Sequence, residues 1–204
     1  MSNQDIPSPI DLRNLSDARE WERTAQARPG RNAVFQSFVS ELMALAYKPL
    51  SVLELGSGPG FLAVHLLNAL PDLRLALLDF SPAMHFLARS RLAEKSSRIR
   101  FIERDFKDPG WSKSIDMFDA VITNQAVHEL RHKQHATTLH RQVRSVLKAD
   151  APYLVCDHYF GEDGLSNASL YMTIDEQAQA LLCAGFTSVK KVIQAGSLVM
   201  HRAS

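Results

Sequence analysis

Apolar and polar residues alternate along the chain in two patterns. One pattern is typical of helices and the other of buried strands. Apolar positions spaced three and four residues apart predict helices over residues 15–27, 32–46, 61–70, 82–94, 133–147 and 174–184. Short unbroken apolar runs, such as Ser51 to Leu55 (SVLEL), are instead typical of buried strands. They predict strands over residues 51–55, 73–78, 98–103, 118–123, 153–156, 186–193 and 197–201.

From residue 51 onward the predicted strands and helices alternate. Because a helix between two strands implies a right-handed crossover, this order predicts a mostly parallel sheet with helices on both faces. The last two strands, joined around Gly196, predict an antiparallel pair. We therefore expect an α/β, doubly wound, seven-stranded sheet whose last strand is antiparallel. Ligands of such sheets bind beyond the carboxyl ends of the strands, where the strand order reverses.

The segment before the sheet is read as a separate part. Its first ten residues are polar and contain Pro7 and Pro9, which predicts a loosely held tail. Two helices follow, and Lys48-Pro49 is expected to end the second. We therefore divide the chain into a tail with lid helices (residues 1–48) and a ligand-binding domain (residues 49–204).

Composition and charge narrow the class of protein. The chain has 204 residues, 46% of them hydrophobic, and a formal net charge of +1, so no basic surface for nucleic acid or an anionic membrane is expected. Cys156 and Cys183 lie in apolar runs, which predicts two buried free thiols in a reducing compartment. There is no signal-like start and no apolar run of about 18 to 20 residues that could cross a bilayer. A cytoplasmic location is the expectation.

The main chemical signal is the glycine-rich run Glu54-Leu55-Gly56-Ser57-Gly58-Pro59-Gly60, between the first strand of the sheet and its helix. Glycines there permit a tight turn and a close approach of the backbone to a ligand. The spacing is G-x-G-x-G rather than the G-x-G-x-x-G of dinucleotide enzymes, and Pro59 removes a donor that a pyrophosphate needs. These features favour a ligand without phosphate over a nicotinamide cofactor.

Acidic residues end the next two strands. Asp79 lies about 20 residues beyond the glycines, where a carboxylate accepts hydrogen bonds from two ribose hydroxyls. Asp105 follows the third strand and can accept a bond from an adenine amino group, with Phe106 flanking the ring. Three strand ends thus converge on one nucleoside.

From about Ser51 to the C-terminus the chain resembles the class I S-adenosylmethionine-dependent methyltransferases. The resemblance implies a Rossmann-like fold, S-adenosylmethionine as cofactor and S-adenosylhomocysteine as product. It implies that the methionine part is held by the glycine-rich motif, with Glu54, Gly56, Ser57, Gly58 and Gly60. Glu54 has an alternative, structural reading, in which it caps backbone amides near the loop.

The same resemblance assigns the other cofactor contacts. It makes Asp79 the ribose-binding acid, with Phe80 beside the adenine and Met84 within a D-x-S-x-x-M pattern. It places Asp105 and Phe106 in the adenine-binding motif. It also places Asn124, at the end of the fourth strand, where the backbone faces the methionine portion.

Methyl transfer from a sulfonium needs alignment and the exclusion of water, and a general base only if the acceptor keeps its proton. His128 and His158 follow the fourth and fifth strands and are the catalytic candidates, with Glu129 and Asp157 beside them. His128 has a structural alternative, packing beneath the cofactor. His132, His135 and His140 lie nearby among basic residues, which indicates a solvated helix face rather than a metal site.

The acceptor pocket is expected between the N-terminal helices and the segment from Tyr159 to Thr173. Its candidate residues are Trp21, Arg28, Arg31, Phe35, Tyr159, Tyr171 and Met172. Arg28 or Arg31 could bind an acidic acceptor or the carboxylate of the cofactor. The expected partner is a small-molecule acceptor.

Other functions remain in competition. A methyltransferase acting on the amino groups of DNA bases usually has an N/D-P-P-Y/F tetrad after the fourth strand, where this chain has Asn124-Gln125-Ala126-Val127. A protein or RNA acceptor is the alternative within methyl transfer. A module that binds S-adenosylmethionine without catalysis is the alternative to an enzyme.

Overall fold

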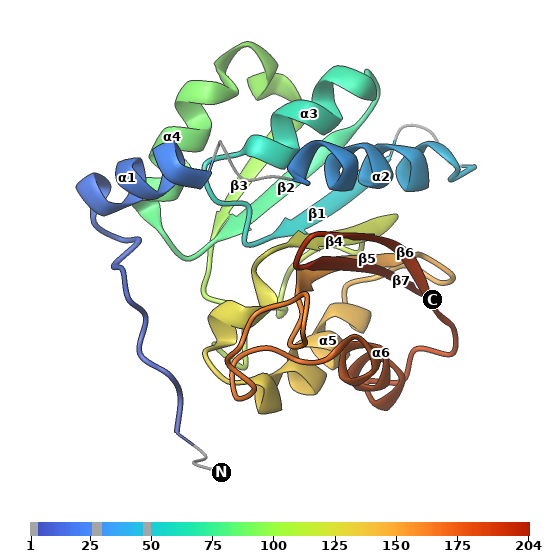
Figure 1. The fold of residues 1–204 in the computed structure, drawn as a ribbon. Coiled ribbons are helices and arrows are strands. Elements are labelled where there is room, and N and C mark those ends of the chain that lie inside the picture. Colours follow the sequence, from blue (N-terminus) through green and yellow to red (C-terminus); the bar gives the residue numbers. More distant parts are fainter. Residues whose placement is uncertain (1–3, 26–29, 47–49) are drawn as a thin grey trace.

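The computed structural model describes residues 4–25, 30–46 and 50–204, and its elements follow the predicted alternation (Figure 1). The α-helices are α1 (Leu15–Ala25), α2 (Arg31–Met43), α3 (Phe61–Ala69), α4 (Pro82–Arg91), α5 (Ala136–Arg144) and α6 (Ile174–Cys183). Short 3₁₀ helices are η1 (Ala93–Arg98), η2 (Val127–Leu130) and η3 (Lys133–His135). The strands are β1 (Ser51–Leu55), β2 (Arg74–Asp79), β3 (Ile99–Glu103), β4 (Ala120–Asn124), β5 (Tyr153–His158), β6 (Val189–Ala195) and β7 (Leu198–Ala203).

The seven strands form one sheet in the order β3-β2-β1-β4-β5-β7-β6. The first five of these positions pair in parallel, and β7 is antiparallel to both β5 and β6. The predicted Rossmann-like, doubly wound sheet with an antiparallel last strand is therefore confirmed. Its order reverses between β1 and β4, which places the expected ligand site at the carboxyl ends of these two strands.

Helices cover both faces of the sheet, with α2, α3 and α4 on one side and α5 and α6 on the other (Figure 1). This follows from the period of two along each strand. In β1, Val52 belongs to the core on the α2–α3 side, whereas Leu53 and Leu55 belong to the core on the α5–α6 side. The two cores hold the carboxyl ends of the strands in fixed register.

The N-terminal segment differs most from the prediction of a loosely held tail. Its described part is tied to the body of the protein, because the backbone N–H of Ile6 donates to the Arg131 carbonyl (2.8 Å) and the Arg131 guanidinium donates to the carbonyls of Ile6 and Pro7. The division of the chain at residue 48 stays a prediction, since α2 shares its core with α3. The expected helix end at Lys48-Pro49 lies outside the described residues.

Two sequence interpretations of burial are also wrong. Cys156 is buried as expected, but Cys183 is exposed, because it lies on the outer side of α6. His140, expected on a solvated face, is 1% exposed and packs against the ring of Tyr153 on the inner side of α5. Among the described residues, no helix is long and apolar enough to cross a membrane.

Candidate active site

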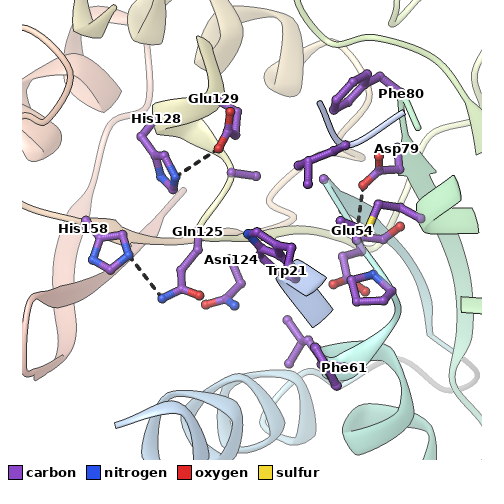
Figure 2. A pocket seen from close by; sticks show the side chains of 18 of the residues that line it. Trp21, Glu54, Phe61, Asp79, Phe80, Asn124, Gln125, His128, Glu129 and His158 are labelled. Atoms are coloured by element: carbon purple, nitrogen blue, oxygen red, sulfur yellow. Dashed lines mark hydrogen bonds and ion pairs between the residues drawn. The ribbon is translucent and has the colours of Figure 1, made fainter. Parts of the chain in front are cut away.

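A cavity of about 490 Å³ opens at the carboxyl ends of β1, β2, β4 and β5, at the point where the strand order reverses (Figure 2). Residues that follow each of these strands contribute to its wall, as do α1, α2 and the segment before α1. Figure 2 shows two separate groups of side chains, with Glu54, Asp79 and Phe80 on one side and His128, Glu129 and His158 on the other.

The glycine-rich bend forms the floor beside β1. Gly56 has a φ of 66°, and a Cβ there would lie 2.4 Å from the Cβ of Ala126, so this glycine lets the loops after β1 and β4 touch. Gly58 has a φ of 53° and lines the cavity, where a Cβ would meet nothing within 4 Å. Gly60 is not a lining residue. It is the N-cap of α3, and a Cβ there would lie 2.9 Å from a methyl carbon of Leu92, so the close packing at this point favours glycine. Its cofactor contact stays a prediction.

Two buried acids lie beside this bend. The Asp79 carboxylate accepts hydrogen bonds from the N–H groups of Gly58 (2.7 Å) and Ser81 (3.0 Å). Burial raises the pKa of Asp79 to about 6 against these hydrogen bonds. Burial and then the charge of Asp79 raise the pKa of Glu54 to about 8. Neither acid forms an ion pair with any described residue, so both would gain from a positively charged ligand.

Three buried polar atoms on the cavity wall have no hydrogen-bond partner among the described residues. They are Glu54 Oε2, Ser57 Oγ and Asn124 Oδ1. Such atoms are rare in folded proteins, and the amide oxygen of Asn124 can only accept a hydrogen bond. Gln125, next along the loop after β4, has a φ of 57°, an uncommon conformation for a residue with a side chain. The wall is therefore arranged for a ligand with several N–H or O–H donors.

The opposite side of the cavity is a coupled set of histidines and carboxylates. Asp157, at the end of β5, lies 2.6 Å from His128 Nδ1 through one oxygen and accepts the His128 backbone N–H (2.8 Å) through the other. His128 Nε2 lies 3.4 Å from Glu129. His158 contacts Ser197 through Nδ1 (2.8 Å), and its ring lies 5.6 Å from that of His128.

The two carboxylates control the charge of His128. Burial by itself lowers the pKa of His128, but the charge of Asp157 and the hydrogen bonds to Asp157 and Glu129 outweigh burial and raise this pKa to about 10. In turn, burial would raise the pKa of Asp157, but His128 holds it below its ordinary value. At neutral pH the pair is an imidazolium beside a carboxylate.

Part of the chain also matches a known protein family. Residues 52–150 match a family described as a methyltransferase domain. This match and two curated relatives identify residues 52–150 as a methyltransferase domain of the class I, S-adenosylmethionine-dependent type.

Two curated methyltransferases match part of the same region. The malonyl-[acyl-carrier protein] O-methyltransferase of Nitrosospira multiformis is 29% identical over 117 residues, which are 48% of this chain and 38% of that enzyme. The demethylmenaquinone methyltransferase of Deinococcus radiodurans is 39% identical over 92 residues, which are 45% of this chain and 32% of that enzyme. The matched regions thus span only about a third of each relative.

The fold resembles that of a methyltransferase of known structure. Human N-acetylserotonin methyltransferase, solved in complex with S-adenosylmethionine, aligns with a TM-score of 0.70 at 18% identity. The alignment covers 94% of this chain and 58% of the human one. At this identity the likeness concerns the fold.

Most of the methyltransferase residues expected from the sequence line the cavity. Those brought together are Glu54, Gly56, Ser57, Gly58, Asp79, Phe80, Met84, Phe106, Asn124, His128 and His158. Gly60 and Asp105 are not lining residues, and the adenine contact expected of Asp105 stays a prediction. The Asp105 carboxylate accepts the Lys107 N–H (3.0 Å) and lies 3.7 Å from Arg13, so it closes the turn after β3 outside the cavity wall.

Only some of the residues expected around the acceptor line the cavity. Four of these candidates border the cavity, namely Trp21, Arg31, Phe35 and Tyr171. Tyr159 does not, because its hydroxyl group accepts a bond from Gln194 (3.0 Å), and Met172 packs in the core on the α5–α6 side. Arg28 lies outside the described residues.

Sequence reasoning missed the part of the wall that precedes α1. Pro9, Ile10 and Leu12 line the cavity, although this segment reads as a polar tail. Ile6 and Ile10, the apolar residues on either side of its prolines, were the available signal. Within the described residues there is no group of three or more histidine, cysteine or acidic side chains placed to hold a metal ion. Of the nearby histidines, His132 accepts the Gln134 N–H and His135 contacts Asp5.

Proposed function

We propose that this protein transfers the methyl group of S-adenosylmethionine to an acidic hydroxyl group of a small molecule. The observation on which the proposal depends is the division of a single cavity. Two buried acids without a positive partner occupy one side, and a histidine that is already paired with a carboxylate occupies the other. The matched curated enzymes and the fold neighbour support the reaction class, and one of the curated enzymes is by name an O-methyltransferase.

The acid side fits the cofactor. S-adenosylmethionine supplies, when bound, a methyl group on a positively charged sulfur that leaves as a neutral thioether. Asp79 is placed to accept hydrogen bonds from ribose hydroxyls, and Phe80, Met84 and Phe106 provide an apolar wall for the adenine. The unpartnered oxygens of Glu54 and Asn124 match the three donors of an ammonium group.

The histidine side fits the acceptor. Because the pKa of His128 is raised to about 10, it lies close to that of a phenol, about 10 in water. A protonated His128 can hold an acceptor oxygen that enters as an anion, and a neutral His128 can take the proton of one that enters with it. In the first case the proton is already on the imidazole, and in the second case it moves there from the acceptor. In both cases the acceptor oxygen attacks the methyl carbon without its proton.

Asp157 and Glu129 keep this histidine oriented. Asp157 binds both Nδ1 and the backbone N–H of His128, which leaves Nε2 directed towards the cavity and Glu129. His158, which contacts Ser197 and borders the same space, is the second candidate for binding the acceptor. Trp21 and Tyr171 add aromatic wall, which excludes water from the reacting atoms.

A ligand panel tests the cofactor half of the proposal. S-adenosylmethionine and S-adenosylhomocysteine should each raise the melting temperature of the wild-type protein, NADH should not, and the rise should disappear in Asp79→Ala. A rise with NADH alone would reject the cofactor assignment.

Transfer of a radiolabelled methyl group tests the acceptor half. We expect label on phenols, enols or carboxylic acids before amines of similar size. Label that appears on RNA or protein instead, or cofactor binding without any transfer, would replace the small-molecule proposal with one of its two alternatives.

A further inference from the structure

Residues 5–12 form an extended segment, here called the strap, that follows the cavity from one side to the other. Its cavity-facing residues are Pro9, Ile10 and Leu12. Figure 1 shows the segment leaving α1 and running past the edge of the sheet towards the layer of α5 and α6. A ligand held between Asp79 and His128 therefore lies beneath the strap along its length.

The strap is fixed at two points, one at each side of the cavity. Near Asp79, the Leu12 carbonyl accepts a hydrogen bond from the hydroxyl group of Ser81, the residue that caps α4. Near His128, the strap meets Arg131, which is 8% exposed. Asp5 also contacts His135 (2.8 Å), but this contact lies at the surface.

Arg131 makes several bonds to the strap at once. Its carbonyl accepts the Ile6 N–H (2.8 Å), its Nε donates to the Ile6 carbonyl (2.8 Å) and its Nη2 donates to the Pro7 carbonyl (2.9 Å). The φ of Arg131 is 68°, a costly conformation for a residue with a Cβ. In this conformation both the backbone and the side chain of Arg131 form hydrogen bonds with the strap.

The same guanidinium also reaches the reactive side of the cavity. Arg131 Nη1 lies 3.5 Å from Glu129, the carboxylate next to His128 Nε2. One side chain thus contacts both the strap and the group beside the catalytic histidine. Three hydrogen bonds join the strap to Arg131, on the side of the cavity where the acceptor would bind.

We propose that the strap is a cover that must open for cofactor exchange, and that Arg131 is the latch that holds it shut. This inference rests on the proposed function only in assuming that S-adenosylhomocysteine binds in the cavity. Pro7 and Pro9 suit such a cover, because proline restricts the backbone to extended shapes and limits the number of open states.

Rate constants for S-adenosylhomocysteine binding test the latch. Trp21 borders the cavity, so stopped-flow tryptophan fluorescence can follow association and dissociation. In Arg131→Gln, both rate constants should rise by about tenfold or more, the factor expected for the loss of one charge-assisted hydrogen bond. Ile6→Pro removes the donor on the strap and leaves Arg131 in place, and it should raise both rate constants in the same direction.

Arg98→Gln is the matched control. Arg98 also donates to backbone carbonyls, those of Leu67, Leu70 and Pro71, but it is not a cavity residue. Its replacement should leave both rate constants unchanged. Hydrogen exchange of residues 8–12 should accelerate in Arg131→Gln and not in the control.

The outcomes distinguish a failure of the latch from a failure of the proposed methyltransferase function. Wild-type protein that binds no S-adenosylhomocysteine would reject the proposed function. Binding with wild-type rate constants in both Arg131→Gln and Ile6→Pro would reject the latch alone. A rise in dissociation without a rise in association would also reject it, because a lost contact and not an opened cover would then explain the change.

Discussion

The two sides of the cavity bury carboxylates of the same kind in opposite electrostatic states. Beside the glycine-rich bend, Glu54 and Asp79 have pKa values raised to about 8 and about 6. Beside β5, Asp157 is just as deeply buried, yet its pKa is lowered. The difference is His128, whose imidazolium lies 2.6 Å from Asp157.

This contrast shows that burial alone does not set the charge of a site. The pair at β5 is complete within the chain, so it can serve a reaction without help from a ligand. The acids at β1 and β2 lack such a partner among the described residues and gain most from a cation that arrives with the ligand. The cofactor of this family carries two positive groups, an ammonium and a sulfonium, and we propose that these charges compensate the two acids.

Replacing His128 should have the largest effect and should be confined to the histidine side. We expect His128→Asn to lower turnover by about a hundredfold to ten-thousandfold, because a neutral asparagine can neither hold an acceptor anion by its charge nor take the proton of a neutral acceptor. The affinity for S-adenosylhomocysteine should change little. Steady-state kinetics and calorimetry measure the two quantities, with His135→Asn as the control for an exposed histidine. Unchanged turnover would remove His128 from the reaction.

Replacing Asp79 should weaken cofactor binding on the side of the cavity beside the glycine-rich bend. Asp79→Asn keeps the shape of the side chain but loses its charge, and we expect the affinity for S-adenosylmethionine to fall by about tenfold to a hundredfold. Asp105→Asn is the matched control, because Asp105 lies outside the cavity wall. An equal loss in Asp105→Asn would instead support the adenine contact that the sequence predicts for Asp105.

The pH dependence of cofactor binding should be smaller but more specific. Glu54 and Asp79 bind protons in the ligand-free protein because their pKa values are raised, and a cationic ligand favours their ionised forms. Affinity should therefore increase as the pH rises from 6 to 8, by at most about tenfold per pH unit for each proton released.

Calorimetry at pH 6, 7 and 8 measures this dependence, and buffers of different ionisation enthalpy count the released protons. Glu54→Gln should flatten the upper part of the pH range and leave the part governed by Asp79. An affinity for cofactor that falls with rising pH would show that the acids do not face its positive groups.

The fold and the cofactor side could largely be predicted from the sequence. Strand order follows from alternation, and the glycine-rich bend and Asp79 are close enough in the chain for spacing to place them on adjacent strand ends. Phe106 lines the cavity, whereas the adjacent Asp105 does not, because a turn directs neighbouring side chains to different sides and the local sequence pattern does not show which.

The histidine side and the strap depended on contacts between distant residues. Asp157 reaches His128 across 29 positions and Arg131 reaches Ile6 across 125, distances over which periodicity carries no information. The burial of His140 was missed for the same reason, because the basic residues around it in sequence point away from the core that it enters. Tertiary packing decided each of these features.

A crystal structure of the protein with S-adenosylhomocysteine bound tests the central claim most directly. We predict that the ribose of the product contacts Asp79 and that its sulfur faces the side of the cavity lined by His128. A ribose bound beside His128, or a product bound away from both Gly58 and Asp79, would contradict the division of the cavity into a cofactor side and an acceptor side.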